Sequence, residues 1–141
     1  PKAVAVLDSK RDNCNYPYHD LSGAGVGFKL TQAIAQKMKV DENLVFESLD
    51  LVAISIAADI VPITGENRVL AYFGLQRLNK NPRPGILTLL QSAGLRKGKS
   101  KKFYFDKEIT ISDFVFLLGP RINAAGRIES ATDSVKLMIS K

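Results

Sequence analysis

The chain has 141 residues, of which 45% are hydrophobic and 24% charged, so it can form one domain with a buried core and is not wholly disordered. A single cysteine, Cys14, excludes an internal disulfide and favours a reducing compartment, so we expect a cytoplasmic protein. The longest apolar stretch, residues 51–63, is interrupted by Asp59 and Pro62 and is too short to cross a bilayer. No secretion leader is recognisable, and we expect no membrane association.

The first residues predict a strand. Pro1 is followed at once by an apolar, β-favouring run, and residues 3–8 predict one buried strand of a parallel sheet. Natural chains seldom begin inside a strand, so we expect a fragment of a longer protein.

Helical patterns fill most of the remaining chain. Ser22 can cap a helix whose apolar face is formed by Val26, Leu30, Ala33, Ile34 and Met38. Residues 48–58 predict an almost wholly apolar, buried helix, and residues 85–93 a short helix closed by Gly94. Between them, residues 66–78 predict an amphipathic helix with Val69, Leu70, Phe73, Leu75 and Leu78 facing inward. We therefore expect an α/β chain that is mostly helical, with most of its sheet outside these residues.

The net charge of +6 is concentrated in one segment. Five of the seven residues at 96–102 are basic and none is acidic, so the rest of the chain holds 15 basic and 14 acidic residues. Such a loop suits polyanion contact through counterion release, and a solvated hairpin tip without a partner is the alternative. The candidate polyanion contacts are Arg96, Lys97, Lys99, Lys101 and Lys102.

The segment Gly119-Pro120-Arg121-Ile122-Asn123-Ala124-Ala125-Gly126-Arg127 predicts an irregular turn. Proline interrupts a helix, and Gly126 allows close approach of the backbone to a ligand. Arginine forks and a carboxamide at this spacing suit phosphate oxygens. Arg121, Asn123 and Arg127 are therefore phosphate-binding candidates, unless the arginines only pair with nearby carboxylates.

Asp59 is the strongest candidate for a metal ligand. It lies at the end of the most apolar stretch of the chain, where an unpaired carboxylate is costly. It must therefore cap a structure, pair with a cation such as Arg68, or bind a metal. His19, the only histidine, is expected to be a surface or packing residue.

Three segments in this order resemble the RecJ exonuclease family of the DHH phosphoesterase superfamily. They are residues 16–30 (YPYHDLSGAGVGFKL), residues 57–68 (AADIVPITGENR) and residues 119–127 (GPRINAAGR). The resemblance covers nearly the whole chain. It places residues 1–141 after the family's Asp-His-His motif, as the C-terminal part of a parallel-sheet DHH catalytic domain with flanking helices.

The resemblance implies a hydrolase that degrades single-stranded DNA from the 5′ end, in DNA repair and recombination. Two Mn²⁺ or Mg²⁺ ions would activate water and stabilise the charge on the scissile phosphate. Asp59 matches the family's last metal-binding aspartate, and Arg121, Asn123, Gly126 and Arg127 match a loop facing the cleft. Single-strand-binding protein and helicases are the implied partners of the full-length protein.

The departures from the family pattern limit what the chain can do alone. The early aspartate motifs and the Asp-His-His triplet are absent, so we expect the isolated chain neither to retain metal nor to hydrolyse DNA. Ser55-Ile56 also stand where many relatives have Gly-Thr. Two alternatives remain: a phosphodiesterase acting on short oligonucleotides or cyclic dinucleotides, and a catalytically silent DNA-binding scaffold.

Overall fold

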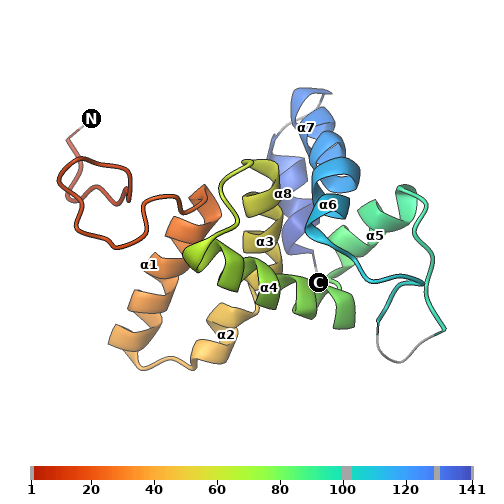
Figure 1. Cartoon of the computed structure of the whole chain (residues 1–141), viewed down its shortest axis with the longest axis horizontal. Helices are drawn as coiled ribbons and strands as arrows, with labels where there is room; N and C mark the ends of the chain where they lie inside the picture. The colour runs from red at the N-terminus through yellow and green to blue at the C-terminus, as the bar shows by residue number, and fades with distance from the viewer. Residues whose placement is uncertain (1, 100–102, 129–130, 141) are drawn as a thin grey trace.

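The computed structural model describes residues 2–99, 103–128 and 131–140, with the side chains at 123, 125–128, 131 and 134 outside the description. The described part is mostly helical, with α3 upright in the middle, α1 and α2 on one side and α5 to α8 on the other (Figure 1). The elements in chain order are α1 (Gly23–Met38), α2 (Glu42–Phe46), α3 (Leu49–Ala58), α4 (Gly65–Lys80), α5 (Pro84–Ser92), α6 (Ile111–Asp113), the π-helix η1 (Phe114–Leu118), α7 (Gly119–Ile128) and α8 (Ala131–Ile139).

The central helix, α3, is buried along its length, as its apolar sequence predicts. One side of it contributes Ala53, Ile54 and Ala57 to a core shared with α4, α5 and the α6–η1 region. Its other side contributes to a second core, which includes Phe28 of α1 and Leu70 of α4. The helix therefore joins two hydrophobic cores and fixes the position of its own C-terminal end, where Asp59 lies.

Two contacts fix α3 against its neighbours. A Cβ atom placed on Gly74 of α4 would lie 2.2 Å from the Leu49 carbonyl oxygen, so only glycine allows this approach of the two helices. At the start of α3, Asp50 is 1% exposed and forms a bidentate ion pair with Arg83, at 2.6 Å from Nε to Oδ2 and 2.7 Å from Nη2 to Oδ1. Arg83 also donates to the Glu47 carbonyl oxygen, so the N-terminal end of α3 is tied to the start of α5.

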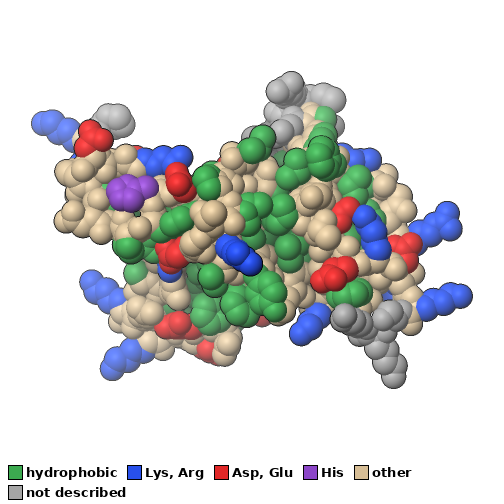
Figure 2. Space-filling view, viewed as in Figure 1, with side chains coloured by type: hydrophobic (Ala, Val, Ile, Leu, Met, Phe, Trp, Pro, Cys, Tyr) green, Lys and Arg blue, Asp and Glu red, His purple; other side chains and the backbone are tan. Residues whose placement is uncertain are grey.

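The apolar faces predicted for α1 and α4 are only partly buried. Ser22 caps α1 as predicted, but Leu30 and Ile34 remain about half exposed, and Phe28 and Ala35 form the buried contacts instead. On α4, Leu70 and Leu78 are buried as predicted, whereas the exposed side chains include Val69, Tyr72 and Phe73. Hydrophobic side chains consequently gather over α4 in the surface view (Figure 2). Phe28, Phe46, Val69 and Phe73 help to line a groove of about 770 Å³.

The strand predicted for residues 3–8 is not formed. These residues lie in an exposed loop without strand pairing, and Val4 and Val6 face solvent. A strand requires a neighbouring backbone to accept and donate its hydrogen bonds, and the described part of the chain offers none to this segment. Within that part, β-structure is limited to one isolated antiparallel bridge, between Lys97 and Phe105.

The prediction of an irregular turn at residues 119–127 is wrong, because α7 spans Gly119–Ile128. The preceding π-helix explains how the chain continues through Pro120. The Gly119 amide donates to the Phe114 carbonyl oxygen, five residues back, which widens the turn just before the proline. Because a π-turn shifts the hydrogen-bond register, the amide that proline lacks does not interrupt the helix. In the described ranges, no helix is both long and apolar enough to cross a membrane.

Candidate metal and DNA site

Asp59 is the C-terminal capping residue of α3, and its carboxylate is exposed. The Ser55 hydroxyl donates to Asp59 Oδ2 at 3.0 Å, and its oxygen also lies 3.4 Å from the Ala24 amide at the start of α1. Ser55 thus connects the carboxylate to the first turn of another helix. In the sequence, this serine stands out only as a departure from the family pattern, without a role.

The alternative in which Asp59 forms a buried ion pair with Arg68 is wrong. The last buried residue of α3 is Ala57, and the exposed Asp59 lies two residues beyond it. None of the ion pairs formed among the described residues includes Asp59. Its oxygen atoms therefore stay open to an external cation.

The turn after Asp59 has an unusual backbone. Ile60 adopts a φ of 52° with its side chain 84% exposed. For a β-branched residue this left-handed conformation costs about 1–3 kcal/mol, which the surrounding structure must offset. Two donors meet at the end of the turn, where the Pro62 carbonyl oxygen accepts from the Tyr18 hydroxyl at 3.1 Å and from Asn67 Nδ2 at 3.0 Å.

Asn67 connects this turn to the segment that precedes α1. It is fully buried, and Nδ2 also donates to the Asp20 carbonyl oxygen at 2.6 Å. The aromatic ring of Tyr18 packs over Gly65, whose φ is +46°; a Cβ atom there would lie 2.6 Å from the ring. Residues 16–22 and 59–67, which are far apart in sequence, therefore form a single unit around Asp59.

Glu66 adds a charged contact between the start of α4, the segment before α1 and α1 itself. Glu66 Oε2 accepts from the Tyr16 hydroxyl at 2.6 Å, and Glu66 Oε1 lies 2.6 Å from Lys29 Nζ. Burial raises the pKa of Glu66, but the hydrogen bonds from Lys29 and Tyr16 and the Lys29 charge outweigh burial, so this pKa lies below its usual value. Burial lowers the pKa of Lys29, yet the bond to Glu66 and its charge raise that pKa overall.

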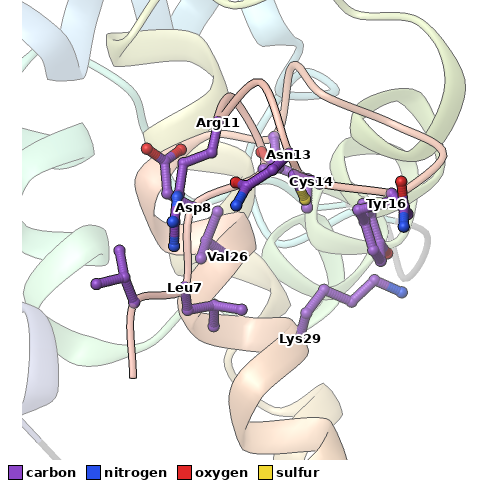
Figure 3. Close-up of a pocket in the computed structure, with 12 residues that line it drawn as sticks. Leu7, Asp8, Arg11, Asn13, Cys14, Tyr16, Val26 and Lys29 are labelled. Carbon is purple, nitrogen blue, oxygen red and sulfur yellow. The ribbon is translucent and has the colours of Figure 1, made fainter. Parts of the chain in front are cut away.

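A small cavity lies beside this contact, beneath the N-terminal loop. Its volume is about 330 Å³, and the loop passes over the start of α1 to form one of its walls (Figure 3). Leu7, Cys14 and Tyr16 line it from the loop, and Val26 and Lys29 from α1. Cys14 is a free, half-buried thiol. His19 is exposed, as expected for a surface residue, and its carbonyl oxygen accepts a hydrogen bond from Ser9 Oγ.

Residues 119–127, the third segment that resembles RecJ, lie on the helix α7 instead of a turn. Ile122 packs on the core formed by α3, and α7 contacts α3 directly, so the segment belongs to the same body as Asp59. Arg121 Nη1 donates to the Leu117 carbonyl oxygen at 2.8 Å, and within the described part of the chain its other guanidinium donors have no partner. The side chains of Asn123 and Arg127, and the surroundings of Gly126, lie outside the described residues.

The basic loop lies apart from this unit. It connects α5 to α6, at the opposite end of the molecule from the N-terminal loop and α1 (Figure 1). Lys97 Nζ lies 5.6 Å from the centre of the Tyr104 ring, and Arg96 and Lys99 are exposed. Phe105 is fully buried and belongs to the core that α3 shares with α5. Lys101 and Lys102 lie outside the described residues.

The Asp59 carboxylate suits the role of one ligand of a divalent ion, but the residues described around it do not form a complete metal site. An exposed carboxylate without a cationic partner is a hard oxygen donor of the kind that Mg²⁺ and Mn²⁺ prefer. In the ranges 2–99, 103–128 and 131–140, however, no group of three or more His, Cys, Asp or Glu side chains could hold a metal ion. Asp59 fits as a contributor whose co-ligands are other residues.

Comparison with known proteins identifies the origin of this arrangement. The chain is 38% identical over 141 residues to the single-stranded-DNA-specific exonuclease RecJ of Bacillus subtilis, a match that spans 100% of this chain and 16% of that protein. It is 35% identical over 149 residues to RecJ of Escherichia coli, which spans 99% of this chain and 24% of the relative. The chain belongs to the RecJ family. No family model matches it.

Solved structures agree with the RecJ assignment. RecJ from Thermus thermophilus in complex with Mn²⁺ superimposes with a TM-score of 0.69 and 27% identity, over 90% of this chain and 17% of that one. An exonuclease RecJ bound to manganese matches with a TM-score of 0.68 and 27% identity, over 89% of this chain and 29% of that one. The chain thus spans about a sixth to a quarter of the curated RecJ relatives' lengths.

Sequence reasoning missed the residues that assemble the unit. Tyr18 and Asn67 lie within the segments that resemble RecJ, but nothing in their spacing shows that both donate to one carbonyl oxygen. A buried asparagine two residues after a glycine, at the start of a helix, carries no distinctive sequence signal. Only the fold brings these side chains together.

Proposed function

We propose that this chain forms part of the catalytic domain of a metal-dependent exonuclease that degrades single-stranded DNA from its 5′ end. The observation that carries the proposal is one exposed carboxylate, Asp59, held by two segments that both match RecJ sequences. Residues 1–141 would then be the C-terminal part of a DHH domain, with the parallel sheet supplied by other parts of that domain. The protein would act in the cytoplasm, in DNA repair and recombination, with single-strand-binding protein and helicases as partners.

Asp59 is the residue that would hold Mn²⁺ or Mg²⁺, together with ligands from outside this chain. When bound, a pair of such ions activates water and stabilises the charge of a scissile phosphate. Ser55 orients the carboxylate by its hydrogen bond to Oδ2, and the other lone pairs of the carboxylate stay available. The support for the metal is the exposed, cation-free carboxylate and the Mn²⁺-bound and Mg²⁺-bound structures of RecJ relatives.

The DNA strand would lie along α7. Arg121 and Arg127, six residues apart on one helix, would contact phosphates, with Asn123 and Gly126 beside them. The basic loop at residues 96–102 would make a separate, sequence-independent contact with the strand, because its described part, residues 96–99, is remote from α1 and the Asp59 unit. The isolated chain would neither retain metal nor hydrolyse DNA, because Asp59 alone cannot form a two-metal site.

The direct test uses a full-length RecJ-family protein that carries this chain. With Mn²⁺ and 5′-labelled single strands, the wild type should release nucleotides from the 5′ end and Asp59→Asn should lose at least about 100-fold in rate, as expected for a lost ligand. Preference for two-to-five-residue oligomers would favour the oligonucleotide phosphodiesterase instead. Absence of hydrolysis in the wild type, with DNA binding intact, would favour the silent scaffold. The 141-residue chain should show no degradation under the same conditions.

A further inference from the structure

The turn after Asp59 has a conformation that its own residues do not explain. Ile60 is β-branched and adopts a φ of 52°, yet its side chain is 84% exposed and gains no burial in return. The strain must be sustained by contacts elsewhere in the turn. Backbone strain of this kind occurs mainly at functional sites, where it helps to place a reacting or binding group.

The contacts that sustain the turn converge on one atom. The Pro62 carbonyl oxygen, three residues after Asp59, accepts from Asn67 Nδ2 at 3.0 Å and from the Tyr18 hydroxyl at 3.1 Å. Asn67 Nδ2 reaches the Asp20 carbonyl oxygen as well, at 2.6 Å. One buried amide therefore joins the Asp59 turn, the start of α4 and the loop before α1.

The orientation of the Asn67 amide leaves a buried acceptor without a hydrogen bond among the described residues, and packing alone does not explain this loss of free energy. The side chain is fully buried, and its Oδ1 atom has no hydrogen-bond partner in the described structure. A buried acceptor without a partner is rare in folded proteins and calls for an explanation. The orientation of the amide allows Nδ2 to donate both hydrogen bonds, while Oδ1 accepts none from the described residues.

We infer that Asn67 is a positioning residue for Asp59, with Tyr18 as the second donor. Both hold the turn at residues 60–62 and through it the direction of the Asp59 carboxylate; neither is expected to touch the metal. The inference rests on the proposed function, in which Asp59 binds a divalent cation. Groups that orient a metal ligand commonly change metal affinity about 10- to 100-fold when they are removed.

The test measures Mn²⁺ binding to a full-length RecJ-family protein that carries this chain, by electron paramagnetic resonance of the free ion. Asn67→Ala should raise the Mn²⁺ dissociation constant at least about 10-fold. The matched control is Asn79→Ala, since Asn79 is also buried, at 3% exposure, and donates to the Leu75 and Ile109 carbonyl oxygens far from Asp59. This control should lose stability and keep the wild-type Mn²⁺ affinity. Wild-type affinity in Asn67→Ala, or an equal loss in Asn79→Ala, would overturn the inference.

A second pair of variants applies if Asn67→Ala does not fold. Tyr18→Phe removes only the hydroxyl, which donates to the Pro62 carbonyl oxygen and also lies 3.3 Å from Thr64 Oγ1. This variant should weaken Mn²⁺ binding about two- to tenfold, the effect of losing the hydrogen bond to the turn. Tyr72→Phe removes an exposed hydroxyl on α4, outside residues 16–22 and 59–67, and should bind Mn²⁺ as the wild type does. Equal affinities for the two phenylalanine variants would contradict the positioning role.

The Asp59→Asn variant distinguishes a failure of the positioning role from a failure of the proposed metal-binding role of Asp59. If Asp59→Asn keeps the wild-type Mn²⁺ affinity, the proposed role of Asp59 fails, and the positioning role fails with it. If Asp59→Asn loses Mn²⁺ binding while Asn67→Ala and Tyr18→Phe retain it, only the positioning role is wrong.

Discussion

Replacing Arg83 with methionine is expected to destabilise the chain severely, because it leaves a buried carboxylate without its cation. Asp50 is 1% exposed, and both of its oxygens accept from Arg83, at 2.6 and 2.7 Å. Removing one partner of a buried ion pair costs about 3–5 kcal/mol. Arg83 also donates to the carbonyl oxygens of Glu47 and Met138, and both bonds are lost in the variant.

This loss is large compared with the stability of a typical domain. Folded proteins are stable by about 5–15 kcal/mol, and for a chain of this size 1 kcal/mol corresponds to roughly 3–5 °C in Tm. Arg83→Met should therefore unfold roughly 10–20 °C below the wild type. Urea denaturation and thermal unfolding of the 141-residue chain, followed by circular dichroism, measure both quantities.

An exposed ion pair provides the control for Arg83→Met. Lys136 and Asp133 lie 3.2 Å apart on α8, with side chains 70% and 53% exposed. Lys136→Met should change the free energy of unfolding by less than about 0.5 kcal/mol, as is usual for surface pairs. If Arg83→Met lowered the free energy of unfolding by no more than Lys136→Met does, the reasoning that a buried, paired carboxylate anchors α3 would be refuted.

Three further predictions concern packing, pH and DNA contact. Gly74→Ala should destabilise the chain by about 1–3 kcal/mol in urea denaturation, because its Cβ atom would meet the Leu49 backbone; Gly27→Ala, with nothing within 4 Å, should not destabilise it. The pKa of Glu66 is lowered in the folded state, so its stabilisation is present above its unfolded pKa of about 4.3 and is lost as pH falls through the folded value. Glu66→Gln should therefore show a shallower loss of stability in acid than the wild type, and an unchanged acid profile would count against this contact. In a full-length protein, Arg127→Gln should reduce the salt slope of single-strand binding by about 0.7, whereas Lys37→Gln, on α1, should leave the slope unchanged.

The helical part of the fold could be predicted because its signals are local. The run at residues 48–58 is apolar on all sides, and α3 is indeed buried against neighbours on two sides. Ser22 caps the start of α1, and Gly94, with its positive φ, follows the end of α5, as their residue types predict. Pro120 was misleading because the sequence does not reveal the π-turn before it, which shifts the hydrogen bonds so that the helix continues.

Non-local features could not be predicted in the same way. Residues 3–8 have strand-forming composition, but a strand depends on a partner backbone that is not among the described residues. Leu30, Ile34 and Phe73 follow helical periodicity and yet are exposed, because periodicity shows which side chains share a face and not what covers it. The hydrogen bonds from Tyr18 and Asn67 to Pro62 connect residues 44 and 5 positions apart, and only the folded chain shows that they meet.

The central claim is that Asp59 binds a divalent metal in an exonuclease site. Anomalous diffraction from crystals of the full-length protein soaked in Mn²⁺ tests it most directly. The account predicts a manganese peak at ligand distance from the Asp59 carboxylate, within roughly 2.0–2.6 Å. Manganese bound elsewhere in the catalytic domain, with no anomalous density beside Asp59, would contradict it.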